Sequence, residues 1–473
     1  MNTHSHYLDI FKVTQLQLQS LVGTALSRGG DFADLYFEHT TFFNLILRDG
    51  NVSSGGFHTD YGVGIRVLKG EKTGYAYSEN LEMSEMVKAA EAASAIAQAG
   101  GSSLSYSSGA TARPTEDLYT MQQNWRDMQA STFLPFLLDL EKQITSKDNR
   151  IIKVMARLSD SVSDVLMYNS FGELTCETRP MGSLSVTVVF QQNGNTENKS
   201  ISRSFRMGAE LITPALIEDI ASEAVKGIDE RFEAIRPKGG QMSVVMGAGP
   251  SGVLLHEAMG HAFEADFNRK GQSIFSEKMG VRVCPEGVNV VDDGTLMNNR
   301  GACGYDDEGV PGQKTYMVTD GILTSYLHDR ISAAWYGVAP TGNGRRENFR
   351  YNPIPRMRAT YMESGNAEPE GIIASVNKGI YVEELSNGQV KIGEGDFTFF
   401  VKSGYLIENG HLTAPIKDIN IIGNGPQALA DILAVGNDLR IDNSTWTCGK
   451  EQSVAVSCGM PTILVSSLTV GGE

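Results

Sequence analysis

The most informative stretch of this chain reads SVVMGAGPSGVLLHEAMGH and spans residues 243–261. Its first four residues form a short run with two β-branched valines, which is typical of a buried strand. A glycine-rich turn follows at 247–252, and the apolar run at 253–255 then enters a helix. This turn lacks the Gly-Lys-Ser/Thr ending of a phosphate-binding loop. We therefore expect a strand, a tight turn and a helix that carries residues 256–261 from the end of the strand.

The helix entry contains an unusual group of polar residues. His256 and His261, two of the eight histidines of the chain, flank Glu257. Neutral imidazoles are good zinc ligands, and a carboxylate beside them can act as a base on a water that the metal activates. In the H-E-x-x-H motif the histidines are four residues apart and share one helix face. Here they are five residues apart, which turns them about 140° from one another on a regular helix.

Either of two local distortions would bring both imidazoles to one ion. A single π-type turn aligns residues that are five apart, and such turns are frequent at functional sites. Alternatively the helix ends before His261, and Gly260 permits either arrangement. We therefore expect a π-type turn or a helix break near Gly260. The alternative is that both histidines are ordinary polar residues of a half-buried helix, with their rings pointing apart.

A catalytic zinc ion takes three protein ligands and keeps one position open. Distance along the sequence does not rank the candidates for the third ligand, which besides several carboxylates are Cys284, Cys303, His328, His411, Cys448 and Cys458. Cys448 lies in the turn-like segment TWTCGK at 445–450, where Lys450 would favour a thiolate. Cys458 equally fits a thiol packed within a strand.

The composition predicts a soluble globular protein with two domains. A chain of 473 residues is longer than one ordinary hydrophobic core supports. The net charge of −16 argues against a nucleic-acid-binding surface, which needs clustered Lys and Arg. The first residues lack the pattern of a signal peptide, and no apolar run is long enough to span a membrane. The five cysteines do not suggest a disulfide framework. We expect a cytoplasmic protein that binds neither nucleic acid nor membrane.

The N-terminal half combines helical periodicity with strand patterns. Apolar spacing predicts helices near 12–28, 81–99, 133–147 and 214–232. Strand patterns occur at 33–38, 43–47, 62–67 and 184–190, and Asp49-Gly50 predicts a hairpin turn. The polar, turn-rich segment at 236–240 marks the expected domain boundary. We therefore predict that residues 1–235 form an N-terminal domain with layers of helices on a sheet.

The C-terminal half changes to short strands and glycine turns. Strand patterns at 314–318 and 379–382 are followed by turn signals at Asp320-Gly321 and Asn387-Gly388. Helical patterns are few in this half. We therefore predict that residues 236–473 form a mainly antiparallel β domain, a barrel or a curved sheet, which carries the helix with both histidines. The predicted fold class is α+β.

Several motifs resemble the TldD branch of the TldD/PmbA family of zinc metalloproteases, also named modulators of DNA gyrase. Besides the histidine motif at 256–261, they are GEKTGYAYS at 70–78, GNGRRE at 342–347, PRM at 355–357, CGK at 448–450 and LTVGG at 468–472. The resemblance extends over nearly the whole chain. The PmbA branch, also called TldE, is similar in fold but lacks the metal motif, so this chain resembles the catalytic branch.

The resemblance implies a metal site and a reaction. It makes His256, His261 and Cys448 the zinc ligands, and we keep Cys458 as the fallback for the third. Glu257 is then the general base that takes a proton from the attacking water and passes one to the leaving amine. The implied substrates are small or unfolded polypeptides, such as a microcin precursor or a labile antitoxin. The implied partner is a PmbA/TldE-like subunit, with a homodimer as the alternative.

Two further points concern binding. Because the C-terminal domain is expected to be rich in short strands, an extended peptide could bind to it as an added strand. The alternative function is a non-enzymatic modulator that binds DNA gyrase or another protein and uses the metal for structure. A structural zinc has four protein ligands, whereas a catalytic zinc has three. The acidic composition makes direct DNA binding the weakest form of this alternative.

Overall fold

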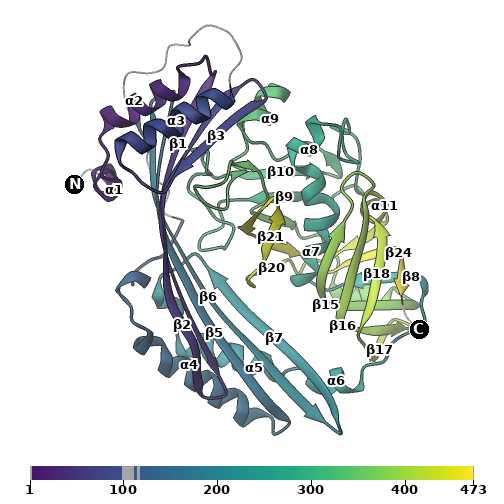
Figure 1. The fold of residues 1–473 in the computed structure, drawn as a ribbon. Helices are drawn as coiled ribbons and strands as arrows, with labels where there is room; N and C mark the ends of the chain where they lie inside the picture. Colours follow the sequence, from purple (N-terminus) through teal and green to yellow (C-terminus); the bar gives the residue numbers. More distant parts are fainter. Residues whose placement is uncertain (1–2, 98–110, 114–117, 472–473) are drawn as a thin grey trace.

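A computed structural model of the chain describes residues 3–97, 111–113 and 118–471. It confirms the α+β class, with a long curved sheet in the N-terminal half and a β barrel in the C-terminal half (Figure 1). Among the described residues, no helix has the length and apolar character needed to cross a membrane.

The N-terminal sheet has the strand order β3-β2-β1-β5-β6, with β7 and the short β4 both paired to β6. Its strands are β1 (Phe32–Arg48), β2 (Asn51–Lys69), β3 (Lys72–Ser78), β4 (Thr111–Ala112), β5 (Ile151–Asn169), β6 (Glu173–Gln192) and β7 (Asn195–Phe205). The two strands expected at 33–38 and 43–47 are one strand, because residues 39–42 also pair with both neighbours. The turn at Asp49-Gly50 is confirmed, and both residues have positive φ, as a type I′ turn requires.

Two groups of helices cover the two ends of this sheet (Figure 1). They are α1 (Thr3–Phe11), α2 (Gln15–Leu26) and α3 (Met83–Ile96) at one end, and η1 (Trp125–Asp127), α4 (Ala130–Lys147), η2 (Ala209–Leu211), α5 (Pro214–Val225) and α6 (Ile228–Glu233) at the other. Thr14 and Thr213 begin α2 and α5, because their hydroxyls accept hydrogen bonds from backbone N–H groups of the first turn. The helix predicted at 214–232 is interrupted at Gly227, whose φ is +73°.

In the described part of the chain, five C-terminal strands close into a barrel in the order β15-β8-β24-β18-β16, because β15 also pairs with β16. These strands and their two neighbours are β8 (Gly240–Met246), β15 (Lys378–Val390), β16 (Asp396–Glu408), β17 (His411–Ile416), β18 (Ile419–Asn424), β19 (Ile432–Val435) and β24 (Ile463–Gly471). The turn predicted at Asn387-Gly388 is wrong. These residues continue β15, and a bulge shifts the register against β16 there.

A second C-terminal sheet has the order β11-β10-β9-β14-β23-β20, and two hairpins stand apart from it. The sheet strands are β9 (Val290–Asp293), β10 (Lys314–Thr319), β11 (Ile322–Leu323), β14 (Ala359–Met362), β20 (Arg440–Asp442) and β23 (Ser457–Met460), and the hairpins are β12 (Gly344–Arg345) with β13 (Ile354–Pro355) and β21 (Thr447–Lys450) with β22 (Gln452–Ala455). The predicted turn at Asp320-Gly321 is confirmed between β10 and β11. The remaining helices are η3 (Pro250–Gly252), α7 (Val253–Leu255), η4 (His256–Gly260), η5 (His261–Phe263), α8 (Ala265–Arg269), α9 (Arg330–Tyr336), α10 (Pro369–Ala374) and α11 (Gly425–Ala430).

Buried charges join the N-terminal sheet to the C-terminal half. Arg66 on β2 is fully buried and donates to Asp34 of β1 and, over 2.6 Å, to Glu308. Arg179 on β6 donates to Asp307, also over 2.6 Å. The segment 307–308 therefore lies against the middle of the sheet and fixes the position of the C-terminal half.

Candidate metal centre

A π-helical turn places His256 and His261 on the same side of the helix. The strand β8 ends at Met246, and the helical segment begins after the glycine-rich turn, as the sequence predicts. Within η4 the backbone N–H of His261 donates to the carbonyl of His256, five residues earlier. The two ring centroids are 5.0 Å apart, with the ring planes at 84°. The predicted π-type turn is therefore confirmed, and the rings do not point apart.

Gly260 is needed in this turn for a reason that the sequence does not reveal. Its backbone has ordinary helical angles, with φ −53°. A Cβ atom at this position would lie 1.9 Å from Sδ of Met357, which is fully buried. Gly260 therefore allows close approach of the neighbouring chain.

Cys448 on β21 meets both histidines. Its Sγ lies 3.1 Å from Nε2 of His256 and 3.2 Å from Nε2 of His261. Within the ranges that the structure describes, these three side chains are the one group of His, Cys, Asp or Glu with the spacing of a metal site. Cys458 lies on β23 and does not join them. The other candidates for the third ligand are also outside this cluster: Cys284, Cys303, His328 and His411.

The donor set fits a zinc ion. Tetrahedral ligands with bonds of about 2.0 Å to nitrogen and 2.3 Å to sulfur lie about 3.5 Å apart, so the three atoms need only small shifts. Burial alone would raise the pKa of the Cys448 thiol, but the two imidazoles lower that pKa to about 4. Cys448 is therefore poised as a thiolate, the form that binds metals.

Glu257 lies within η4, next to this cluster. Its Cγ would be 3.0 Å from a Cβ added at Gly388, so the side chain packs against the bulged part of β15. Burial raises the pKa of the Glu257 carboxyl above its ordinary value, although both imidazoles favour the charged form. A buried carboxyl group with a raised pKa, next to the candidate metal ligands, is suited to proton transfer.

Glu264, Lys450 and Arg356 surround the cluster; from the sequence, Lys450 was expected to favour the Cys448 thiolate, whereas Glu264 and Arg356 were given no role. Oε2 of Glu264 is 3.0 Å from Nδ1 of His261 and 3.0 Å from Nζ of Lys450. Burial alone would raise the pKa of Glu264, but Lys450, His261 and Arg356 lower it to about 2. The sequence did carry a signal for Glu264, because it is a carboxylate three residues after His261, a predicted ligand. Metal-bound histidines commonly donate their second ring N–H to a carboxylate.

Known proteins resemble this chain over nearly its whole length. Residues 33–97, 123–229 and 239–472 match models of domain 1, the central domain and the C-terminal domain of the PmbA/TldA metallopeptidases. A Haemophilus influenzae protein named metalloprotease TldD homolog is 38% identical over 452 residues, which are 94% of each chain. The chain belongs to the TldD/PmbA family.

Other similar proteins have names that mention zinc, DNA gyrase or TldE. A Saccharolobus solfataricus protein named zinc metalloprotease TldD homolog is 32% identical over 292 residues, 61% of this chain and 65% of that one. A Thermotoga maritima structure described as a candidate modulator of a DNA gyrase has a TM-score of 0.78 and 21% identity, covering 97% and 100% of the two chains. The structure of TldE from Thermococcus kodakarensis has a TM-score of 0.75 and 17% identity, covering 96% and 100%. These two structures show that the fold is that of the TldD/PmbA family.

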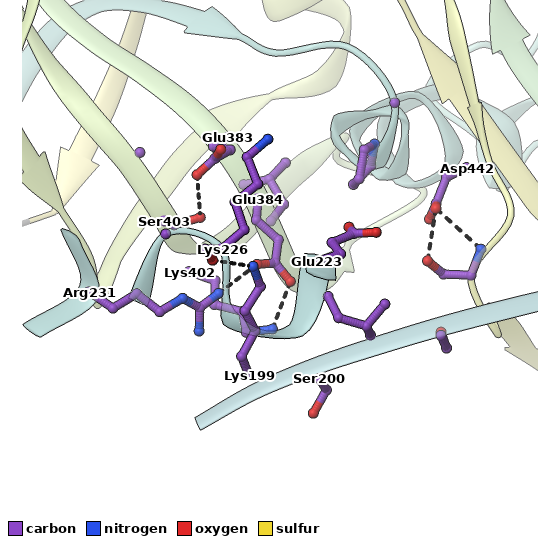
Figure 2. A pocket seen from close by; sticks show the side chains of 18 of the residues that line it. Lys199, Ser200, Glu223, Lys226, Arg231, Glu383, Glu384, Lys402, Ser403 and Asp442 are labelled. Atoms are coloured by element: carbon purple, nitrogen blue, oxygen red, sulfur yellow. Dashed lines mark hydrogen bonds and ion pairs between the residues drawn. The ribbon is translucent and has the colours of Figure 1, made fainter. Parts of the chain in front are cut away.

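A polar pocket of about 1010 Å³ lies between β7, α6 and the barrel of this TldD/PmbA protein. Figure 2 shows Arg231 and Lys402 directed at Glu384 in this pocket, at 2.8 and 2.7 Å. The three side chains of the candidate metal centre do not line it, but Trp446, two residues before Cys448, does. The pocket is therefore close to the candidate metal centre in the sequence, but the residues that could bind a metal are those of the cluster and not those of the pocket.

Proposed function

We propose that the protein is a zinc-dependent peptidase that hydrolyses small or unfolded polypeptides. The observation that carries this proposal is the cluster of His256, His261 and Cys448, whose ligand atoms lie within 4.8 Å of one another. Three donors leave a coordination position open for substrate or water, as in catalytic zinc sites. The name of the Saccharolobus solfataricus relative supports zinc as the metal.

In this proposal each residue of the site has one task. The two imidazoles and the Cys448 thiolate would hold the ion, which would act as a Lewis acid on water and on the scissile carbonyl. Glu257 takes the proton of the attacking water and returns a proton to the leaving amine. The packing of Glu257 against Gly388 keeps its carboxyl beside the ligands.

An extended substrate could enter through the polar pocket. Among the described strands, β7 pairs only with β6, so an added strand could pair with its other edge between Asn198 and Ser204, whose backbones already form single hydrogen bonds there. Lys199 to Arg203 of this strand line the pocket, and the N–H of Ser204 donates to the carbonyl of Asn443 at the same wall. The chain continues from Asn443 to Cys448 in five residues. Backbone pairing at this edge would bind peptides with little sequence preference.

We also propose a PmbA/TldE-like partner subunit. A TldE structure with the same fold over 96% of this chain supports an assembly of two related chains, with a homodimer as the alternative. A cytoplasmic location stays a prediction.

The second candidate function is a non-enzymatic modulator that binds DNA gyrase or another protein. The description of the Thermotoga maritima structure favours it. A structural metal would need a fourth ligand, and within the described residues only three donors gather at the site. Because only three donors gather there, we prefer the peptidase function to the non-enzymatic one.

Zinc analysis and a peptide-degradation assay test the proposal, each with and without a PmbA/TldE-like subunit. Glu257→Ala should retain zinc and lower turnover by about 100- to 10,000-fold, because the proton acceptor is lost and the ligands are kept. The control is Glu218→Gln, which changes an exposed carboxylate on α5 and should have wild-type activity. Full turnover by the Glu257→Ala variant would exclude the role of Glu257. Wild-type protein without bound zinc or peptidase activity would exclude the whole proposal.

A further inference from the structure

A buried carboxylate supports His261 from the side opposite to Cys448. Nε2 of His261 faces Cys448 Sγ at 3.2 Å, while Nδ1 is 3.0 Å from Oε2 of Glu264. The side chain of Glu264 is completely buried. When Nε2 binds a metal, the remaining proton is on Nδ1 and is donated to Glu264, which fixes both the tautomer and the direction of the ring.

The same carboxylate is tied to the hairpin that carries Cys448. Nζ of Lys450, two residues after Cys448, is 3.0 Å from Oε2 of Glu264 and 2.8 Å from Asp266. Nε of Arg356 is 3.8 Å from Oε1 of Glu264. The guanidinium of Arg356 also donates to the backbone carbonyls of Cys448 and Gln452, at 2.7 and 2.8 Å.

The Cys448 hairpin needs such support. Among the described strands, β21 pairs only with β22, so no larger sheet holds it. A two-stranded hairpin alone is marginally stable at best. The ligands His261 and Cys448 are separated by 187 residues, so nothing local in the sequence sets the distance between them.

We infer that Glu264 is a positioning residue of the metal centre, which together with Lys450 and Arg356 braces His261 against the Cys448 hairpin. This inference rests on the proposed zinc site. Removal of such a carboxylate typically lowers metal affinity by about 10- to 100-fold. Because the contacts of Glu264 set the directions of the ligand side chains, their loss also changes the geometry at the metal.

The test uses the full chain and metal alone. Zinc affinity is measured by competition with a chelator, and the absorption bands of the Co²⁺-substituted protein report ligand geometry. The variants are Glu264→Gln and the double variant Glu264→Gln with Lys450→Met. The double variant also removes the buried lysine that would otherwise lose its Glu264 partner. The matched control is Glu363→Gln, because Glu363 pairs with Lys314 over 2.6 Å outside the metal centre. Thermal unfolding of the metal-free proteins shows that each variant folds.

Both Glu264 variants should bind zinc about 10- to 100-fold more weakly and should show altered Co²⁺ bands, with the Glu363 variant unchanged. A folded double variant with wild-type zinc affinity and wild-type Co²⁺ bands would overturn the inference while leaving the zinc site intact. Absence of zinc binding by the wild-type chain would instead overturn the proposed function on which the inference rests.

Discussion

The carboxyl group of Glu38 on β1 shows how strongly burial acts on single residues in this fold. Its oxygens accept hydrogen bonds from the hydroxyl of Thr40 at 2.7 Å and from the backbone N–H of Phe349 at 2.8 Å. Burial, the largest effect, raises the pKa from 4.5 to about 7, although both hydrogen bonds favour the charged form. Folding therefore increases the proton affinity of Glu38.

This shift predicts a pH-dependent stability. Between pH 4.5 and about 7 the folded protein keeps a proton on Glu38 that the unfolded chain has lost. The contribution to the free energy of unfolding is complete below this window and disappears as the pH rises through it. Glu38→Gln removes the titration, so from about pH 5 to about pH 8 wild type should lose about 2.5 kcal/mol relative to the variant. Urea unfolding at both pH values measures this difference.

The control for this prediction is Glu218→Gln, whose exposed carboxylate on α5 should give the same difference from wild type at both pH values. A Glu38→Gln variant that also differs from wild type equally at both pH values would contradict the assigned cause.

Single residues also show where sequence reasoning reaches its limit. The residue types and spacing identified His256 and His261 as a candidate pair, but residues alone left several candidates for the third ligand, with Cys448 and Cys458 among them. The difference between the two thiols is spatial. Cys448 faces two imidazoles, whereas burial, Asp442 and Glu257 raise the pKa of Cys458 well above its ordinary value. These neighbours are brought together only by the fold.

At the scale of elements, the π-helical turn depends on the contact between Gly260 and Met357. A Cβ atom at position 260 would overlap Sδ of Met357, and the Met357 side chain is fully buried. Gly260→Ala should therefore lower the free energy of unfolding by about 1–3 kcal/mol and weaken zinc binding, because η4 must shift. Chemical unfolding and chelator competition measure the two effects.

A double-mutant cycle controls this prediction. In a Met357→Ala background the space beside position 260 is open, and alanine is a better helix former than glycine by about 1 kcal/mol. The same Gly260→Ala replacement should then cost little or stabilise. Equal costs in both backgrounds would show that Met357 is not the cause. Gly56→Ala on β2, where a Cβ meets nothing within 4 Å, is the control for a general glycine effect.

The elements that sequence patterns predicted best are those with strong local signals. The five-residue spacing predicted a π-type turn or a helix break, of which the π-type turn forms, and the Asp49-Gly50 and Asp320-Gly321 turns followed from residues that tolerate positive φ. The prediction at Asn387-Gly388 failed because pairing with β16 extends β15 through these residues. Pairing across the barrel overrode the local turn preference there.

At the scale of the whole molecule, the sequence predicted the α+β class from the change of pattern between the two halves. The division at residue 235 stays a prediction. The way in which the halves are joined could not be predicted, because its contacts are remote along the chain. Arg66 and Glu308, for example, are 242 residues apart and form a buried ion pair.

The last prediction concerns this junction. Arg66→Leu leaves Glu308 buried without its cation and Asp34 with only Arg346, at 4.0 Å, which should lower the free energy of unfolding by about 3–5 kcal/mol. Because Glu308 belongs to the C-terminal half, the loss should also separate the unfolding of the two halves into two transitions in scanning calorimetry. The control is Arg150→Leu, since Arg150 pairs with Asp148 and Asp229 within the N-terminal half and is partly exposed. This control should cost only about 0–1 kcal/mol and keep the wild-type transition shape. Equal behaviour of the two variants would show that the buried pair does not couple the halves.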